Sequence, residues 1–346
     1  MCIHLSFFIL TLLKKILKIF IPLLLAVALL WYILQKVDLK ELLEKFSEVN
    51  YYWVFFAILI SIFSHILRAT RWRLMILPLG YSPRMMNLFT AVMSGYFANI
   101  FLPRAGEFLR CVSLNKSEQV PANLSFGTVI AERAIDFLCL LVLIFLSLLL
   151  EYEMFACFIS KFILSGKKSN FAIVFLLNHW LIIVVIGLFL LLGLFFLRKK
   201  IMNLAIVKKI VAFLLGIWAG VISIKDLNNK SYFIIQTLAI WVCYYLMTYF
   251  MFYALPSTAN LSLIAGLVIL IVGGLGMSAP VSGGIGPFHL MVAGALELFY
   301  GLSQKDGIAY AFLIHTSQML MVIIIGGLLL LLSLFKYKAN SSIKVQ

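Results

Sequence analysis

Charged residues interrupt one of the most apolar stretches of the chain, GTVIAERAIDFLCLL, which contains Glu132, Arg133 and Asp136. Residues four apart share a helix face, so the two acids point the same way, and Arg133 precedes Asp136 by three residues. A charge at the centre of a bilayer costs roughly 2.5–3.5 kcal/mol, so such side chains find partners or face water. Two acids need a cation besides Arg133, and we expect Arg104 or Arg110 to supply it. The alternative is a helix that starts late and leaves these charges near the cytoplasmic interface.

A second charged group follows a proline in the stretch FLPRAGEFLR. Pro103 is expected to end one half-helix, and Gly106 to permit the turn into the next. Arg104, Glu107 and Arg110 follow one another at intervals of three, which predicts that they line one helix face. A half-helix N-terminus carries exposed N–H groups and partial positive charge, so with two arginines it could hold a phosphate. Solvated charges in a cytoplasmic loop are the alternative interpretation.

A second break follows an apolar run, in GGLGMSAPVSGGIGPFH. Glycine and proline are poor helix formers, and lipid offers a broken backbone no hydrogen-bond partner. We therefore expect this stretch to line a polar cavity that faces the first break, opens to one leaflet and is lined by Arg104 or Arg110. His289, in the first turn of the returning half-helix, is a further candidate for substrate binding. A simple kink filled by neighbouring side chains is the alternative. The residues expected to break the helix are Pro280, Gly283, Gly284, Gly286 and Pro287.

Two more arginines, Arg68 and Arg71, lie at the end of an apolar run in LRATRWRLM. Their spacing places both on one helix face. Basic residues beside a tryptophan at a cytoplasmic boundary are ordinary markers of membrane topology. Binding of a lipid phosphate is the alternative role, and both residues are retained as candidates.

The elements that must position these residues are membrane-spanning helices. The chain is 64% hydrophobic and only 12% charged, with a mean hydropathy of +1.10. Runs of about 20 apolar residues recur, which is typical of an all-α polytopic membrane protein. The net charge of +15 does not indicate nucleic-acid binding, because the basic residues follow the loops. No polar block is long enough for a soluble domain, so residues 1–346 are interpreted as a single integral membrane domain.

We predict about six full spans and two re-entrant broken-helix hairpins. The hairpins cover 86–118, entering from the cytoplasm, and 261–300, entering from outside. Each is flanked by two spans, so the halves 51–150 and 232–335 form an inverted repeat, a pattern found in transporters. Eight or more full spans are the alternative. The predicted spans are 16–34, 51–67, 124–150, 171–197, 232–254 and 307–335.

This arrangement places most of the 28 basic residues on the cytoplasmic side, with both termini inside. Cytoplasmic loops are enriched in Lys and Arg, so the charge bias supports that orientation. Residues 36–50 read as an amphipathic surface helix, and 199–230 are expected at the inner surface. Neither segment is assigned a chemical role.

The motifs RATRW (68–72), NIFLPRAGEFLR (99–110), AERAIDF (131–137) and PVSGGIGPFH (280–289) resemble a known family. It is the flippase-like family that includes the transmembrane region of lysylphosphatidylglycerol synthases. That family's pattern usually has a glutamate shortly after the second break, where this sequence has His289. The resemblance implies movement of an anionic or aminoacylated phospholipid, or a lipid-linked headgroup, between leaflets.

The resemblance also implies membrane lipids, expected to be anionic, and a separate lipid-modifying enzyme as partners. No soluble aminoacyltransferase domain is expected. We further expect localisation in the bacterial plasma (inner) membrane. The motifs of nucleophilic catalysis and metal binding are not found, so no cofactor or metal is expected and a transport role is favoured over catalysis. The alternatives are a membrane component of a lipid or lipid-linked glycan biosynthetic enzyme, and a non-transporting scaffold. The oligomeric state is not predicted.

Overall fold

The described chain is built from helices alone. The computed structural model describes residues 24, 29, 31, 44–151 and 205–343, in which no β-strand occurs. This confirms the predicted all-α class. The α-helices with their bounds are α3 (Tyr51–Ile76), α4 (Met85–Phe101), α5 (Ala105–Glu118), α6 (Ala122–Leu150), α9 (Ala205–Ile222), α10 (Lys230–Phe252), α11 (Leu263–Met277), α12 (Pro287–Tyr300) and α13 (Gln304–Ile343).

Four described helical segments are long and apolar enough to cross a membrane. They are Tyr51–Leu79, Ala122–Leu150, Lys230–Phe252 and Gln304–Ser333. They match four of the six predicted spans, although the first runs beyond its predicted end at residue 67. The other two predicted spans, 16–34 and 171–197, lie outside the described residues except for positions 24, 29 and 31. Most of the predicted surface helix 36–50 also lies outside them.

The two regions predicted as hairpins each form a pair of short helices. The arms α4 and α5 have 17 and 14 residues, and α11 and α12 have 15 and 14. At 1.5 Å per residue each arm measures about 21–26 Å, shorter than a hydrocarbon core of about 30 Å. The arms of each hairpin pack against each other. These lengths favour re-entry over full crossing.

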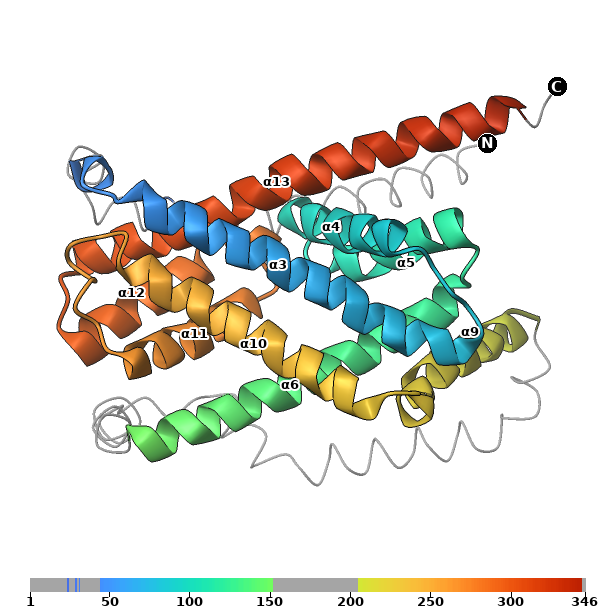
Figure 1. Cartoon of the computed structure of the whole chain (residues 1–346), viewed down its shortest axis with the longest axis horizontal. Helices are drawn as coiled ribbons and strands as arrows, with labels where there is room; N and C mark the ends of the chain where they lie inside the picture. Colours follow the sequence, from blue (N-terminus) through green and yellow to red (C-terminus); the bar gives the residue numbers. More distant parts are fainter. Residues whose placement is uncertain (1–23, 25–28, 30, 32–43, 152–204, 344–346) are drawn as a thin grey trace, which may run out of the picture.

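The order long helix, two short helices, long helix occurs twice, in α3–α6 and in α10–α13. The first helices of the two sets, α3 and α10, lie side by side and run in opposite directions (Figure 1). That the two halves are related as an inverted repeat stays a prediction. α13 crosses α3 in Figure 1 and packs against α4, which connects the second set to the first hairpin.

The first hairpin closes because glycines allow its two helices to touch. A Cβ added to Gly95 would lie 2.8 Å from the Gly106 carbonyl oxygen, too close for any larger residue. The Gly106 N–H also donates to the Asn99 side chain at 2.7 Å. Gly106 therefore allows the close packing of α4 against α5, whereas the sequence predicted that it would form the turn between them. The turn itself is made by Arg104, whose φ of 61° is left-handed.

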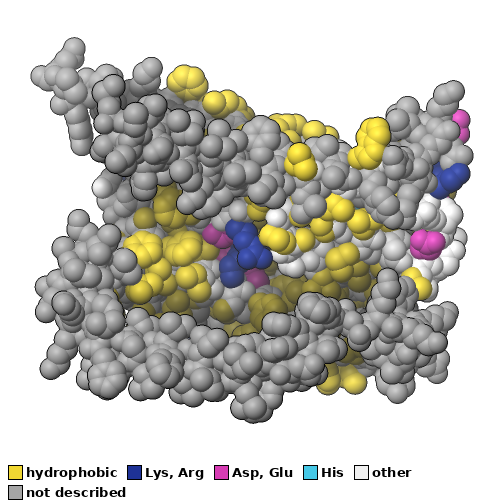
Figure 2. All heavy atoms as spheres, turned by 180° about the vertical axis from the view of Figure 1, so that it is seen from behind, with side chains coloured by type: hydrophobic (Ala, Val, Ile, Leu, Met, Phe, Trp, Pro, Cys, Tyr) yellow, Lys and Arg dark blue, Asp and Glu magenta, His cyan; other side chains and the backbone are white. Residues whose placement is uncertain are grey.

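The surface of the described chain is largely apolar, as expected for a protein surrounded by lipid. α6 exposes a long series of large side chains, including Phe137, Val142 and Phe145. Figure 2 shows Lys or Arg side chains together with Asp or Glu in a depression of one face, bordered by hydrophobic side chains. Charge therefore reaches the surface between apolar side chains of this face (Figure 2).

Candidate functional site

Two arginines on α3 are buried within the helix bundle. Arg68 and Arg71 lie on one face together with Trp72, four residues after Arg68. The exposed fractions of the two arginine side chains are 4% and 0%. Both side chains therefore face the interior of the bundle, where an unpaired charge would be costly, and their place at the cytoplasmic boundary stays a prediction.

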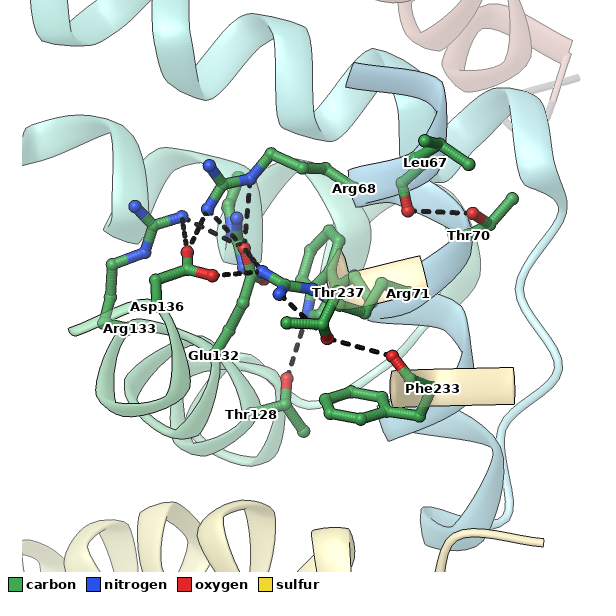
Figure 3. A network of polar contacts seen from close by, with 12 residues as sticks. Leu67, Arg68, Thr70, Arg71, Thr128, Glu132, Arg133, Asp136, Phe233 and Thr237 are labelled. Atoms are coloured by element: carbon green, nitrogen blue, oxygen red, sulfur yellow. Dashed lines mark hydrogen bonds and ion pairs between the residues drawn. The ribbon is translucent and has the colours of Figure 1, made fainter. Parts of the chain in front are cut away.

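Both acids of α6 meet these arginines (Figure 3). Glu132 Oε1 accepts from Arg68 Nη2 at 2.7 Å and lies 3.4 Å from Arg71 Nη2. Asp136 accepts from Arg68 Nη2 at 2.8 Å and from Arg71 Nη2 at 2.7 Å. The i,i+4 spacing of the acids matches the i,i+3 spacing of the arginines, so two helix faces form four charge contacts.

The first hairpin supplies a third buried arginine. Arg110 of α5 donates from Nη2 to Glu132 Oε2 at 2.5 Å, and its side chain is 5% exposed. Its guanidinium carbon lies 4.4 Å from the centre of the Trp72 ring, a favourable cation–π contact. Trp72 is itself held by a hydrogen bond from Nε1 to Thr128 Oγ1 at 2.8 Å. The prediction that Arg110 pairs with an acid of α6 is confirmed.

The fourth arginine, Arg133, connects the buried charges to the surface. It donates to Glu132 Oε1 at 3.0 Å and lies 3.7 Å from Asp136 Oδ2, while 41% of its side chain is exposed. We call the group of Arg68, Arg71, Arg110, Glu132, Arg133 and Asp136 the arginine cluster. Among the described residues no other carboxylate pairs with its arginines. Four arginines face two acids, so the cluster holds an excess of two positive charges.

Helix α10 contributes polar groups that the sequence analysis missed. Tyr244 OH accepts from Arg68 Nη1 at 2.7 Å, and Thr237 Oγ1 accepts from Arg71 Nη1 at 3.3 Å. Beside them, the Gln236 side chain accepts from Thr70 Oγ1 at 3.1 Å. The signal was present in the sequence, because Gln236 and Thr237 interrupt an apolar run, and polar residues within spans bond to neighbouring helices.

The two helix breaks touch each other. Arg104 Nη2 donates to the Ser278 carbonyl at 3.2 Å, and Ser282 Oγ donates to the Phe101 carbonyl at 3.2 Å. The two breaks approach each other as predicted, but they are in direct contact, whereas the prediction placed a polar cavity between them. Arg110 lies in the arginine cluster and does not line a cavity at the breaks.

The second break has the local structure expected from its glycines and prolines. Gly283, Gly284 and Gly286 all have positive φ, the last at 97°. Pro287 begins α12, where its fixed φ suits the first turn. Pro280 lies in the bend between α11 and η4 (Ser282–Gly284). These residues reverse the chain between the two arms, as predicted.

An apolar groove of about 450 Å³ runs between α3 and α10. It is lined by side chains from both helices: Leu59, Ile60, Phe63, Ala239, Val242, Cys243 and Leu246. Phe63 precedes Arg68 by five residues, a rise of about 7.5 Å along α3. The groove therefore lies about one and a half turns of α3 from Arg68, and the exposed Phe63 points to another side of the helix than the buried Arg68.

Comparison with known proteins decides the family. Residues 19–326 match the family described as the lysylphosphatidylglycerol synthase TM region. The chain belongs to this family. Over 125 residues it is 31% identical to the UPF0104 membrane protein MJ1595 of Methanocaldococcus jannaschii. This alignment covers 35% of this chain and 37% of that protein. The chain thus aligns with little more than a third of that relative's length. No solved structure matches it.

Membership of the lysylphosphatidylglycerol synthase TM region family agrees with the four span-length helices. The chain is an integral, multi-pass membrane protein. Three of the four motifs that suggested the family, RATRW, NIFLPRAGEFLR and AERAIDF, supply the charges of the arginine cluster: Arg68, Arg71, Arg110, Glu132, Arg133 and Asp136. The fourth motif, PVSGGIGPFH, forms the second break.

The predicted common face of Arg104, Glu107 and Arg110 is not formed. Arg104 is exposed and directed to Ser278, Arg110 is buried against Glu132, and Glu107 forms no ion pair within the described residues. Three residues advance a helix by about 300°, so two such steps diverge by about 120°. Arg104 also lies before the first turn in a left-handed conformation, which directs its side chain away from that face.

His289 belongs to the second hairpin and contacts none of the arginines described above. Its Nδ1 accepts from the Gly286 N–H at 3.3 Å, which satisfies a free donor at the start of α12. Its ring packs on Phe312, with centres 4.4 Å apart, and meets His315 edge-on at 4.7 Å. His315 Nε2 in turn bonds the Gly283 carbonyl at 2.9 Å. The pair braces the break, so His289 holds the hairpin's shape in this conformation.

Proposed function

We propose that this family member binds an anionic phospholipid or lipid-linked headgroup and moves it between the leaflets of the membrane. The observation that carries the proposal is the charge imbalance of the arginine cluster. Three buried arginines face two carboxylates, and Arg133 adds a second excess charge nearer the surface. An uncompensated charge among buried side chains is costly unless an anion joins it. A lipid phosphate is the anion that a membrane supplies in quantity.

Access from the lipid supports this proposal. Arg133 is 41% exposed, so a headgroup can meet one guanidinium before it reaches the buried ones. The apolar groove between α3 and α10 gives an acyl chain a surface close to the same charges. A lipid could thus keep its tail in an apolar environment while its phosphate enters the bundle.

The contact between the two helix breaks is the part of the structure that would open to let a headgroup pass and close again behind it. Its two hydrogen bonds, from Arg104 to Ser278 and from Ser282 to Phe101, join the hairpins. Each such bond contributes about 1 kcal/mol, so the polar part of this contact is weak, and α4 also packs against η4. We propose that transfer of a headgroup past the cluster requires these hairpins to part.

The proposed setting follows the expected topology. The protein would lie in the plasma (inner) membrane with both termini in the cytoplasm, where basic loops face anionic headgroups. Membrane lipids would be its partners, and a separate lipid-modifying enzyme would supply any aminoacylated substrate. A role in catalysis lacks a supporting observation among the described residues.

The experiment is a leaflet-transfer assay in proteoliposomes. Fluorescent lipids in the outer leaflet are quenched by a membrane-impermeant reductant, so transfer from the inner leaflet appears as a continuing loss of signal. We expect accelerated transfer of lipids with anionic headgroups and little acceleration of zwitterionic ones. Arg110→Gln should reduce the rate strongly, because it removes a buried charge from the cluster.

The matched control is Arg73→Gln, which removes an exposed arginine of the same helix region. It should leave the transfer rate close to that of the unaltered protein. Transfer that is unchanged in Arg110→Gln, with the protein folded, would refute the role of the cluster. Failure to transfer any anionic lipid would refute the proposed function itself.

A further inference from the structure

We propose that the preferred ligand of the arginine cluster is a dianionic phosphate, as in a lipid phosphomonoester, rather than a singly charged phosphodiester. This inference rests on the proposed function and narrows its substrate class. It follows from the number of charges in the cluster and from donors that have no acceptor.

The charge count sets the class of headgroup. The cluster contains four guanidinium groups and two carboxylates, which leaves two positive charges. A phosphomonoester carries close to two negative charges at neutral pH, whereas a phosphodiester carries one. Only the monoester balances the cluster fully. A zwitterionic headgroup, such as a phosphodiester with one ammonium group, leaves the excess unchanged, and an aminoacylated phosphodiester with two ammonium groups increases it.

Unused hydrogen-bond donors support the same conclusion. The Nε atoms of Arg71, Arg110 and Arg133 are buried and have no hydrogen-bond partner among the described residues. Arg71 and the Arg110 side chain are at least nine-tenths buried, so bulk water does not readily satisfy them. A phosphomonoester offers three terminal oxygens, each a strong acceptor, against two for a diester. Arg133 therefore has an unpaired donor on a side chain near the surface, whereas the Nε atoms of Arg71 and Arg110 lie deeper in the bundle.

The exposed fractions of the cluster side chains indicate that a ligand would enter at Arg133. Glu132 is fully buried and Asp136 is 17% exposed, whereas Arg133 is 41% exposed. A phosphate that approaches from the surface meets Arg133 first, and the carboxylates lie behind it. Binding at Arg133 would compensate the excess charge without displacing the Arg68 and Arg71 contacts to Glu132 and Asp136.

The test measures stabilisation of the intact protein by defined lipids. The purified chain is placed in phosphatidylcholine nanodiscs that contain either phosphatidic acid, a monoester, or phosphatidylglycerol, a diester. The two sets are matched in total negative charge, so that general surface attraction is equal. The thermal unfolding midpoint is then followed against lipid content to give an apparent affinity for each. Inorganic phosphate is added to phosphatidylcholine nanodiscs as a separate arm.

We expect phosphatidic acid to bind roughly tenfold or more tightly than phosphatidylglycerol, since one additional unit charge meets partly buried guanidinium groups. Inorganic phosphate should stabilise only at much higher concentration, because it lacks an acyl tail. Arg133→Gln lowers the excess to one charge and should weaken the binding of phosphatidic acid much more than that of phosphatidylglycerol, which removes most of the preference. Arg73→Gln should keep the preference.

The outcomes separate this inference from the proposed function. Equal affinity for both lipids, with anionic lipids still transferred between leaflets, would overturn the monoester preference alone. Inorganic phosphate that binds as tightly as phosphatidic acid would overturn the lipid as ligand. A preference that survives intact in Arg133→Gln would mean that the selectivity arises outside the cluster.

Discussion

Replacement of Glu132 by glutamine tests whether the arginine cluster is held together as described. Glu132 is fully buried and is an ion-pair partner of all four arginines of the cluster. Glutamine has nearly the same shape, so the change removes charge and little packing. It raises the excess in the cluster from two positive charges to three.

The expected cost can be estimated from this geometry. Removing one partner of a buried ion pair costs roughly 3–5 kcal/mol, because the other partner remains as an uncompensated charge. We therefore expect Glu132→Gln to lower the free energy of unfolding by about that amount. The double variant Arg110→Gln/Glu132→Gln restores the original excess of two charges. It should be more stable than Glu132→Gln alone, which is the reverse of additive behaviour.

The assay is equilibrium unfolding in detergent micelles, followed by tryptophan fluorescence. Glu48→Gln is the matched control, since Glu48 is exposed and such surface changes shift stability by about 0.5 kcal/mol or less. The account is refuted if Glu132→Gln unfolds with the same free energy as Glu48→Gln. It is equally refuted if the double variant is destabilised by the sum of its single changes.

Three further predictions follow from individual contacts. Tyr244→Phe removes the acceptor of the 2.7 Å hydrogen bond from Arg68 Nη1 and should lower the free energy of unfolding by about 1.5–3 kcal/mol. Tyr232→Phe, at an exposed position of α10, should have little effect, and equal effects of the two changes would contradict the contact. Gly95→Ala places a Cβ 2.8 Å from the Gly106 carbonyl oxygen and should destabilise the first hairpin. Gly294→Ala, whose Cβ would have nothing within 4 Å, should be neutral or stabilise the protein by up to about 1 kcal/mol. A Gly95→Ala variant as stable as the unaltered protein would rule out the close approach. Arg104→Gln removes one hydrogen bond between the breaks and should change the leaflet-transfer rate with little effect on stability, so an unchanged rate would argue against the gating contact.

Much of the fold was predictable, because hydropathy and helix breakers act locally. The four described spans and both hairpins follow from runs of apolar residues and from Pro103, Gly283 and Pro287. The turn was predicted at Gly106 and is formed by Arg104, since a left-handed arginine at a turn cannot be recognised from composition. The close contact of Gly95 with Gly106 depends on how two helices meet, which spacing within one helix does not specify.

The site was predicted in part for the same reason. Charge pairing within a membrane required a partner for Glu132, and Arg110 was among the expected ones. Arg68 and Arg71 were interpreted as boundary residues, because the predicted span ended at residue 67 while α3 continues to Ile76. That one extension moves both arginines into the bundle. Tyr244 was missed because a tyrosine in an aromatic-rich helix is common at membrane boundaries and indicates nothing about its partner.

The central claim, that the arginine cluster holds an anionic lipid headgroup, is tested most directly by mass spectrometry of the lipids that copurify with the protein. We predict that the unaltered chain retains anionic lipid well above its proportion in the host membrane. The enrichment should fall in Arg133→Gln and persist in Arg73→Gln. Retained lipids that mirror the bulk membrane, in the same amount for all three proteins, would contradict the account.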